Sequence, residues 1–451
     1  MTSPNEPNPS ASAPAPTTKG DGVSVQWLLD DLESAPTPYH AVARAGVVLG
    51  AADFTSVSLE QPLPGGPGRF VASVGGLSMA WVVPEGIDPG AARFTVVGAH
   101  TDSPNLRIRT NADVASAGWA QLGVEIYGGV LLNSWLDRDL GLAGRVTVAG
   151  PDGPEQRLLL DDRPLLRVPQ LAIHLDRAIR EDGLQLDPQK HLTPLWAAGE
   201  APGFADWVAT SLDISSDDIL GWDLMAFDVQ PPALVGLDGD LLASARIDNL
   251  FSSFCGVRAL ADAAPTVVAG DGADGNIPVL VLYDHEEIGS TSATGAAGSA
   301  LAALLERISL AIGNDRGAHL ASLTRSLVVS ADGAHATHPN YVDRHEPSHQ
   351  IAVNAGVVVK RNANQRYATD AVSEGRIRSI CRNAGVPVQT YIHRNDLPCG
   401  STIGPTTAGQ LGVPTVDLGA AQLAMHSIRE LAGVADVGHL TDTLRAAFLT
   451  A

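Results

Sequence analysis

Short apolar runs that end directly at acidic or histidine residues are the feature of this sequence that most restricts its fold. Each run has the length and composition of a buried β-strand, and stretches with helical periodicity lie between them. The expected strands are 94–99, 277–283, 327–330 and 413–418, and the expected helices are 249–264, 299–312 and 373–383. This alternation predicts an α/β fold with a mostly parallel central sheet flanked by helices.

The segment 105–239 has a different pattern. Short strand candidates such as GVEIYGGVLL and GRVTVAG alternate with Gly, Pro and Asp, and helical patterns are few. This is typical of an antiparallel β domain. We therefore expect an insertion at 105–239 that divides an α/β catalytic domain into 23–104 and 240–451. Residues 1–22 are rich in Pro, Ser and Ala and are predicted to be a disordered tail.

Composition excludes several classes of function. The 451 residues are 45% hydrophobic and 18% charged, as in an ordinary folded, soluble protein. The formal net charge of −21 would repel phosphate backbones and anionic membrane surfaces, so we expect no nucleic-acid or membrane partner. The three cysteines are scattered, and no apolar signal or membrane-spanning stretch occurs, which predicts a cytoplasmic protein with reduced thiols.

The first candidate site residues follow two of the predicted strands. His100 and Asp102 in HTDSP follow one strand, and Glu286 and Glu287 in DHEEIGS follow another. Ligands of open α/β sheets bind beyond the carboxyl ends of the strands. Two adjacent carboxylates there would repel each other and lose hydration unless cations hold them. The structural alternatives are a surface His and Asp pair and a solvated acidic turn.

Three further residues complete a possible metal site: Asp248 in ARIDNL, Asp332 in SADGAHATHPNY and His426 in QLAMHSIRE. Taken singly, they could be a helix N-cap, the start of a turn and a packed helix residue. Together with His100 and the Glu pair they offer only nitrogen and oxygen donors. Such a set suits one or two hydrolytic divalent ions, most plausibly Zn²⁺, with Co²⁺ or Mn²⁺ as substitutes.

Nine segments resemble, in the same order, the motifs of the aspartyl aminopeptidase family, metallopeptidase family eighteen. They are HTDSPNLRIR, SWLDRDLGLAGRV, LAIHLDR with HLTP, ARIDNL, DHEEIGS, SADGAHATHPNY, QRYATDAVSE, RNDLPCGSTIGP and LGAAQLAMHSIRE. The resemblance covers nearly all of the chain after the tail. It implies a dinuclear zinc exopeptidase with an α/β catalytic domain, an inserted β-rich dimerisation domain and a dimer-built tetrahedral dodecamer.

The resemblance also assigns roles at the metal site. It implies that Asp248 bridges two divalent ions, that His100 and Asp332 complete one site, and that Glu287 and His426 complete the other. Glu286 would be the general base, and Asp102 would orient His100. The expected reaction is attack by a metal-bridged hydroxide on the first peptide bond of a substrate with a free N-terminus, with Glu286 taking up and returning the proton.

Further residues are implied to bind substrate. The family places a His from a partner subunit in the active site, at the position of His174, where it would steady the oxyanion of the transition state. Lys360 matches the family's Lys for acidic N-terminal residues, so a preference for Asp and Glu is expected. Tyr367 and Asp396 are expected to bind substrate as well.

Three other functions fit the sequence less well. A dinuclear zinc dipeptidase or deacylase of broader specificity would use a similar ligand set, but RNDLPCGSTIGP and QLAMHSIRE match the aspartyl aminopeptidase pattern better. A catalytically inactive scaffold subunit would have lost a ligand or Glu286, and none is missing. A serine hydrolase is disfavoured because no GxSxG motif occurs.

Overall fold

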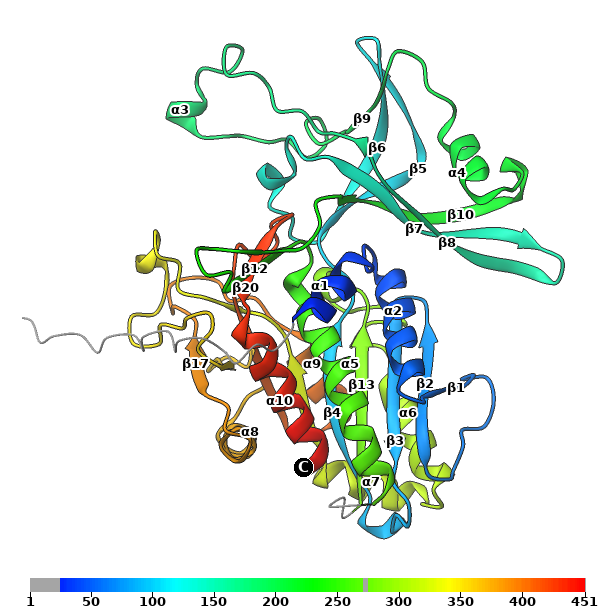
Figure 1. The fold of residues 1–451 in the computed structure, drawn as a ribbon, viewed down its shortest axis with the longest axis vertical. Coiled ribbons are helices and arrows are strands. Elements are labelled where there is room, and N and C mark those ends of the chain that lie inside the picture. The colour runs from blue at the N-terminus through cyan, green and yellow to red at the C-terminus, as the bar shows by residue number, and fades with distance from the viewer. Residues whose placement is uncertain (1–24, 271–274, 451) are drawn as a thin grey trace, which may run out of the picture.

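The computed structural model describes residues 25–270 and 275–450, whose strands form three sheets (Figure 1). The predicted tail at 1–22 lies outside the described residues. The largest sheet, here called the central sheet, has nine strands within this part of the chain. In spatial order they are β1 (Thr55–Ser56), β2 (Gly68–Val74), β3 (Leu77–Val83), β13 (Asn276–Tyr283), β4 (Arg93–His100), β14 (Leu327–Ala331), β18 (Thr415–Gly419), β16 (Val357–Arg361) and β17 (Val388–Ile392).

The middle of the central sheet is parallel. Strands β13, β4, β14 and β18 all run in one direction, and they correspond to the four strands expected from the sequence. On either side, β3 is antiparallel to β13 and β16 is antiparallel to β18. The predicted α/β fold with a mostly parallel sheet is thus confirmed. Because parallel strands end at one edge, the residues that follow β4, β13 and β14 lie close together.

Helices cover both faces of the central sheet, which explains why its strands are apolar throughout. In β4, Phe94 and Val96 pack on one face with residues of α6 and α9, whereas Val97 and Ala99 pack on the other with residues of α1, α2, α5, α8 and α10. The helices are α1 (Gln26–Glu33), α2 (Pro38–Ala51), α5 (Ile247–Val268), α6 (Ala300–Ala311), α7 (Arg316–Arg325), α8 (Ala371–Ala384), α9 (Ile403–Leu411) and α10 (Ala435–Thr450).

The second sheet, here called the insert sheet, is antiparallel and comes from the segment predicted as an insertion. In spatial order its strands are β8 (Gly153–Leu166), β7 (Leu140–Gly150), β10 (Ile219–Asp228), β5 (Asn105–Ser116), β6 (Trp119–Tyr127) and β9 (Leu195–Ala198). The same segment contains two short helices, α3 (Ile179–Asp182) and α4 (Phe204–Leu212). Phe204, the first residue of α4, packs against Trp196, Trp207 and Trp222. Figure 1 shows the insert sheet above one end of the central sheet.

A small third sheet lies between the other two. Its strands, in spatial order, are β11 (Ala233–Val235), β12 (Leu241–Ser244), β20 (Glu430–Gly433), β19 (Ala421–Leu423) and β15 (Ala334–His335). Within it, β12, which follows the insert in the chain, pairs with β20, which lies near the C-terminus.

All three cysteines are free thiols. Among the described residues, every helix is too short or too polar to cross a bilayer.

Candidate metal centre

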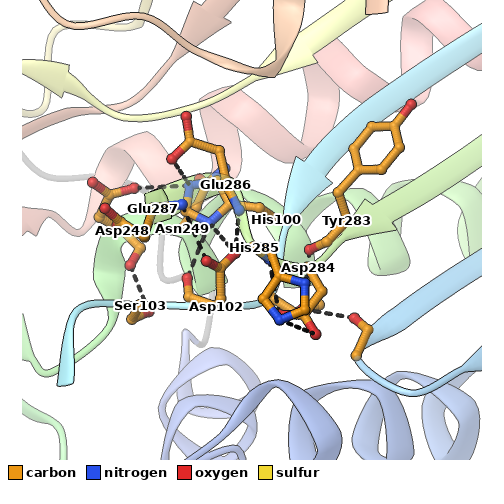
Figure 2. Close-up of polar contacts among 12 residues, drawn as sticks. His100, Asp102, Ser103, Asp248, Asn249, Tyr283, Asp284, His285, Glu286 and Glu287 are labelled. Carbon is orange, nitrogen blue, oxygen red and sulfur yellow. Dashed lines mark hydrogen bonds and ion pairs between the residues drawn. The ribbon is translucent and has the colours of Figure 1, made fainter. Parts of the chain in front are cut away.

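Five segments bring acidic and histidine side chains together at the carboxyl edge of the central sheet. Figure 2 shows three of them, which carry His100, Asp248 and the Glu286–Glu287 pair. His100 is the last residue of β4 and pairs with Tyr283, the last residue of β13. Glu286 and Glu287 follow in a short 3-10 turn. Asp332 comes directly after β14. The remaining two residues come from outside the strand ends: Asp248 lies at the start of α5, and His426 lies between β19 and β20.

Asp248 lies at the middle of this cluster. Its Oδ1 is 3.4 Å from His100 Nε2, and its Oδ2 is 3.4 Å from His426 Nε2. On the His426 side, Glu287 Oε2 is 3.2 Å from His426 Nε2. On the His100 side, Asp332 Oδ1 is 3.9 Å from His100 Nε2. The two oxygens of one carboxylate therefore face two separate groups of donors.

Both imidazole rings are held with Nε2 facing the cluster. His100 Nδ1 is 3.0 Å from the backbone oxygen of Asp102, and His426 Nδ1 is 3.0 Å from the backbone oxygen of Gly129. A carbonyl oxygen only accepts, so each Nδ1 carries the proton. In the neutral ring the Nε2 lone pair is then free for a ligand, as in most metal-binding histidines.

Asp102 is buried and contacts both His100 and the turn that carries Glu286 and Glu287. Its Oδ1 accepts from the Glu286 N–H at 3.0 Å and its Oδ2 from the Glu287 N–H at 3.1 Å (Figure 2). The Tyr127 hydroxyl also donates to Oδ2, at 2.7 Å. The sequence predicted only its link to His100, which runs through the Asp102 carbonyl and a 3.4 Å approach of Oδ1 to Nδ1. The carboxylate thus fixes the turn that carries both glutamates.

Burial and crowding shift the pKa values in the cluster. Burial, the largest cause, and the nearby carboxylates of Asp332 and Asp248 together raise the pKa of Glu286 to about 8. Burial likewise raises the pKa of Glu287 and Asp332. Burial alone would raise the pKa of Asp248 and lower that of His426. The contacts of Asp248 with His100 and His426 outweigh burial. The pKa of Asp248 is therefore lowered, and that of His426 is raised to about 9.

The donors fit zinc on three observations. Two ligands of one tetrahedral zinc, each bound at about 2.0–2.2 Å, lie about 3.3 Å apart, close to the 3.2–3.4 Å separations around Asp248. Asp248 Oδ1 and Glu287 Oε1 are buried without a hydrogen-bond partner. Cysteine is absent from the cluster, and two imidazoles with several carboxylates suit hydrolytic zinc.

A cavity of about 400 Å³ opens onto the cluster, and Lys360 and Tyr367 line it. Lys360 lies near the end of β16, which runs antiparallel to β18, with Val359 opposite Leu418. Its long side chain nevertheless reaches the site, where Nζ donates to the Gly333 carbonyl at 3.0 Å and lies 3.6 Å from Asp332 Oδ2. Lys360 is only 1% exposed, so it is not a solvated surface charge.

The other two residues predicted to contact substrate, Asp396 and His174, lie outside this cavity. Asp396 does not line this cavity; its side chain is 63% exposed and forms an ion pair with Arg394 at 2.6 Å. His174 is exposed on a turn of the insert and does not line the cavity either. A role for His174 in a partner subunit concerns an assembly, so it stays a prediction.

Two residues near the site were missed from the sequence. Glu430 is buried and accepts hydrogen bonds from the backbone of Asp248 and His426. Its only signal was the last letter of QLAMHSIRE, which suggested no chemistry by itself. His335 lines the cavity, and burial lowers its pKa to about 4. It lies in SADGAHATHPNY, where neither of the two His residues could be singled out.

Two imidazoles and four carboxylates lie together at the carboxyl edge of the central sheet of an α/β fold. This arrangement is typical of metal-dependent hydrolases. The model of the family described as aminopeptidase I zinc metalloprotease (M18) matches residues 32–448. A probable M18 family aminopeptidase 2 of Streptomyces coelicolor is 46% identical over 94% of this chain and 96% of its own. The chain therefore belongs to the M18 family of zinc aminopeptidases, as the sequence motifs indicated.

Solved structures agree with this assignment. Ape4, in its complex with Nbr1, superposes with a TM-score of 0.87 at 34% identity and covers 94% of this chain and 85% of its own. The mApe1 dodecamer of S. cerevisiae superposes with a TM-score of 0.80 at 27% identity over 94% of this chain and 95% of its own. The likeness covers both the central sheet and the insert.

Proposed function

We propose that this zinc aminopeptidase removes Asp or Glu from the N-terminus of peptides at a centre of two metal ions. One observation carries the proposal: a single cavity of about 400 Å³ is lined by both the metal-binding cluster and Lys360. The cluster would supply the hydrolytic chemistry, and Lys360 would supply a positive charge for an acidic side chain.

The proposed ligands form two groups that share one residue. Asp248 would bridge the ions, since each of its oxygens faces a different imidazole at 3.4 Å. His100 and Asp332 would complete one site, and Glu287 and His426 the other. Zn²⁺ is the proposed native ion, and Co²⁺ or Mn²⁺ could replace it.

Zinc ions bound here would act as Lewis acids toward the peptide carbonyl and lower the pKa of a bound water. The proposed part of Glu286 is to accept a proton from the attacking water and return it to the leaving amine. Its backbone N–H is held by Asp102, and its carboxylate lies 4.0 Å from His100 Nε2, at the cavity wall. Asp102 would keep both the general base and the His100 ring in place.

Lys360 and Tyr367 are the proposed contacts for the substrate side chain. Lys has three N–H donors, and the Gly333 carbonyl takes one of them. Nζ also lies 3.6 Å from Asp332 Oδ2, which leaves one N–H for a substrate carboxylate. Tyr367 is buried beside Lys360, whose Nζ lies 5.2 Å from the ring centre, and would limit where the ammonium group can move.

We further propose that the chain forms a homo-oligomer built from dimers, up to a dodecamer. The likeness to the mApe1 dodecamer supports this, as do Leu171, Ile173 and Leu175, which are exposed around His174. The cytoplasmic location stays a prediction.

A panel of aminoacyl substrates tests the proposed function. The purified protein should hydrolyse α-Asp and α-Glu substrates faster than Leu or Ala substrates, and should not act on the same peptides with acetylated N-termini. Equal rates on blocked and free peptides would indicate a deacylase or endopeptidase. A faster rate on Leu than on Asp would remove the acidic preference while leaving the aminopeptidase activity.

A further inference from the structure

Glu430 is a buried carboxylate that contacts the backbone of two proposed ligands at once. Glu430 is 2% exposed. Oε2 accepts from the Asp248 N–H at 2.9 Å, and Oε1 accepts from the His426 N–H at 2.7 Å. One side chain thus ties together two ligand segments that are far apart in the sequence.

The small sheet places Glu430 between these segments. In the antiparallel pairing of β12 with β20, Ser244 lies opposite Glu430. From Ser244 the chain passes through Arg246, whose φ is 60°, to reach Asp248, and His426 has a φ of 67°. Left-handed backbone is unfavourable for residues with a Cβ and persists where surrounding contacts hold it. The two hydrogen bonds to Glu430 are contacts of this kind.

The neighbouring residue ties the same strand to the insert. Arg429 donates to the carbonyls of Gln230 and Pro231, at 3.3 and 3.0 Å, just after β10 leaves the insert sheet. The start of β20 therefore contacts the proposed ligands through Glu430 and the exit of the insert through Arg429. Its position is fixed from both sides.

We propose that Glu430 is a positioning residue that sets the backbone of Asp248 and His426 for metal binding. This inference rests on the ligand set of the proposed function. A Gln at this position would keep the shape but has one acceptor oxygen, so its NH₂ would meet one of the two backbone N–H donors. Substitution of groups that orient metal ligands typically weakens metal binding by about ten- to a hundredfold.

Asp436 offers a matched control for the Glu430→Gln variant. It is also a buried carboxylate, 1% exposed, and it accepts two backbone N–H groups, from Asn354 at 2.6 Å and Gly356 at 3.1 Å. His439 is its other partner, so its contacts include no proposed ligand. Asp436→Asn should therefore disturb folding stability in a similar way without acting on the metal centre.

The test compares the zinc dissociation constants of the full-length wild type, Glu430→Gln and Asp436→Asn by competition with a chelating dye. Circular dichroism and the Tm without zinc report folding. Glu430→Gln should bind zinc about ten- to a hundredfold more weakly, while Asp436→Asn stays within about threefold of wild type. Wild-type zinc affinity in folded Glu430→Gln, or an equal loss in both variants, would overturn the proposal.

If Glu430→Gln does not fold, Glu430→Asp takes its place, because it keeps two acceptor oxygens but shortens their reach by one methylene. About tenfold weaker zinc binding is again expected, and unchanged binding would overturn the proposal. A wild type that binds no zinc would instead refute the proposed ligand set, and this inference with it.

Discussion

Glu286 is placed by its backbone, which leaves its carboxylate for chemistry. The Glu286 N–H donates to Asp102, while the side chain remains 16% exposed at the cavity. Glu286→Gln keeps this geometry but cannot accept a proton, so kcat should fall by about 100- to 10,000-fold. Metal content should not change. An unchanged kcat in this variant would mean that another residue is the general base.

Lys360 and Arg361 are adjacent cations with different surroundings, so they form a natural comparison. Lys360 is buried at the cavity, whereas the Arg361 side chain is 44% exposed and pairs with Glu374 at 3.1 Å. A charge-assisted hydrogen bond contributes about 1.5–3 kcal/mol. Lys360→Met should therefore lower kcat/KM for Asp and Glu substrates by about ten- to a hundredfold, with little loss for Leu substrates.

Arg361→Met is the control and should leave the ratio of Asp to Leu activity unchanged. An equal fall for Asp, Glu and Leu substrates in Lys360→Met would show that Lys360 supports the fold or Asp332 and does not select the substrate.

At the scale of elements, strands and their ends were the predictable part. Continuous apolar runs predicted β4, β13, β14 and β18, and the shared carboxyl edge of parallel strands predicted that His100, Glu286 and Asp332 lie together. The direction of β16 was not predictable, because VVVKR reads the same in parallel and antiparallel pairing. Glu430 was missed because its role comes from two backbone contacts that exist only after the small sheet forms.

The strand-end cluster should make the zinc-free protein less stable as pH rises. Without metal, the pKa of Glu286 is about 8 and that of His426 about 9 in the folded chain, above the ordinary values of 4.5 and 6.5. The folded state then binds more protons than the unfolded state between these limits, so the free energy of unfolding falls from about pH 5 to pH 9. The two shifts act in the same direction.

Zinc binding requires deprotonated ligands, so the stabilisation by zinc should grow over the same pH range. Thermal unfolding with and without zinc at pH 5.5, 7 and 8.5 measures this. A Tm increase from zinc that is constant or shrinks with pH would contradict the pKa shifts in the cluster.

For the whole molecule, we predict that a complete active site needs two chains. His174 is exposed on the insert, outside the cavity, and is predicted to act in a partner subunit. Two inactive variants, His174→Ala and Glu286→Gln, should then regain activity when mixed, because a hybrid dimer contains one site with both residues intact. No recovery despite demonstrated subunit exchange would place His174 within its own chain or outside catalysis.

The central claim is that five ligands, with Asp248 between the other four, hold two zinc ions on which hydrolysis depends. Elemental analysis of active protein, combined with exhaustive chelation and zinc readdition, tests it most directly. The predicted result is two zinc ions per chain, loss of activity on chelation and recovery with zinc. Full activity after chelation, or active protein with less than one divalent ion per chain, would contradict it.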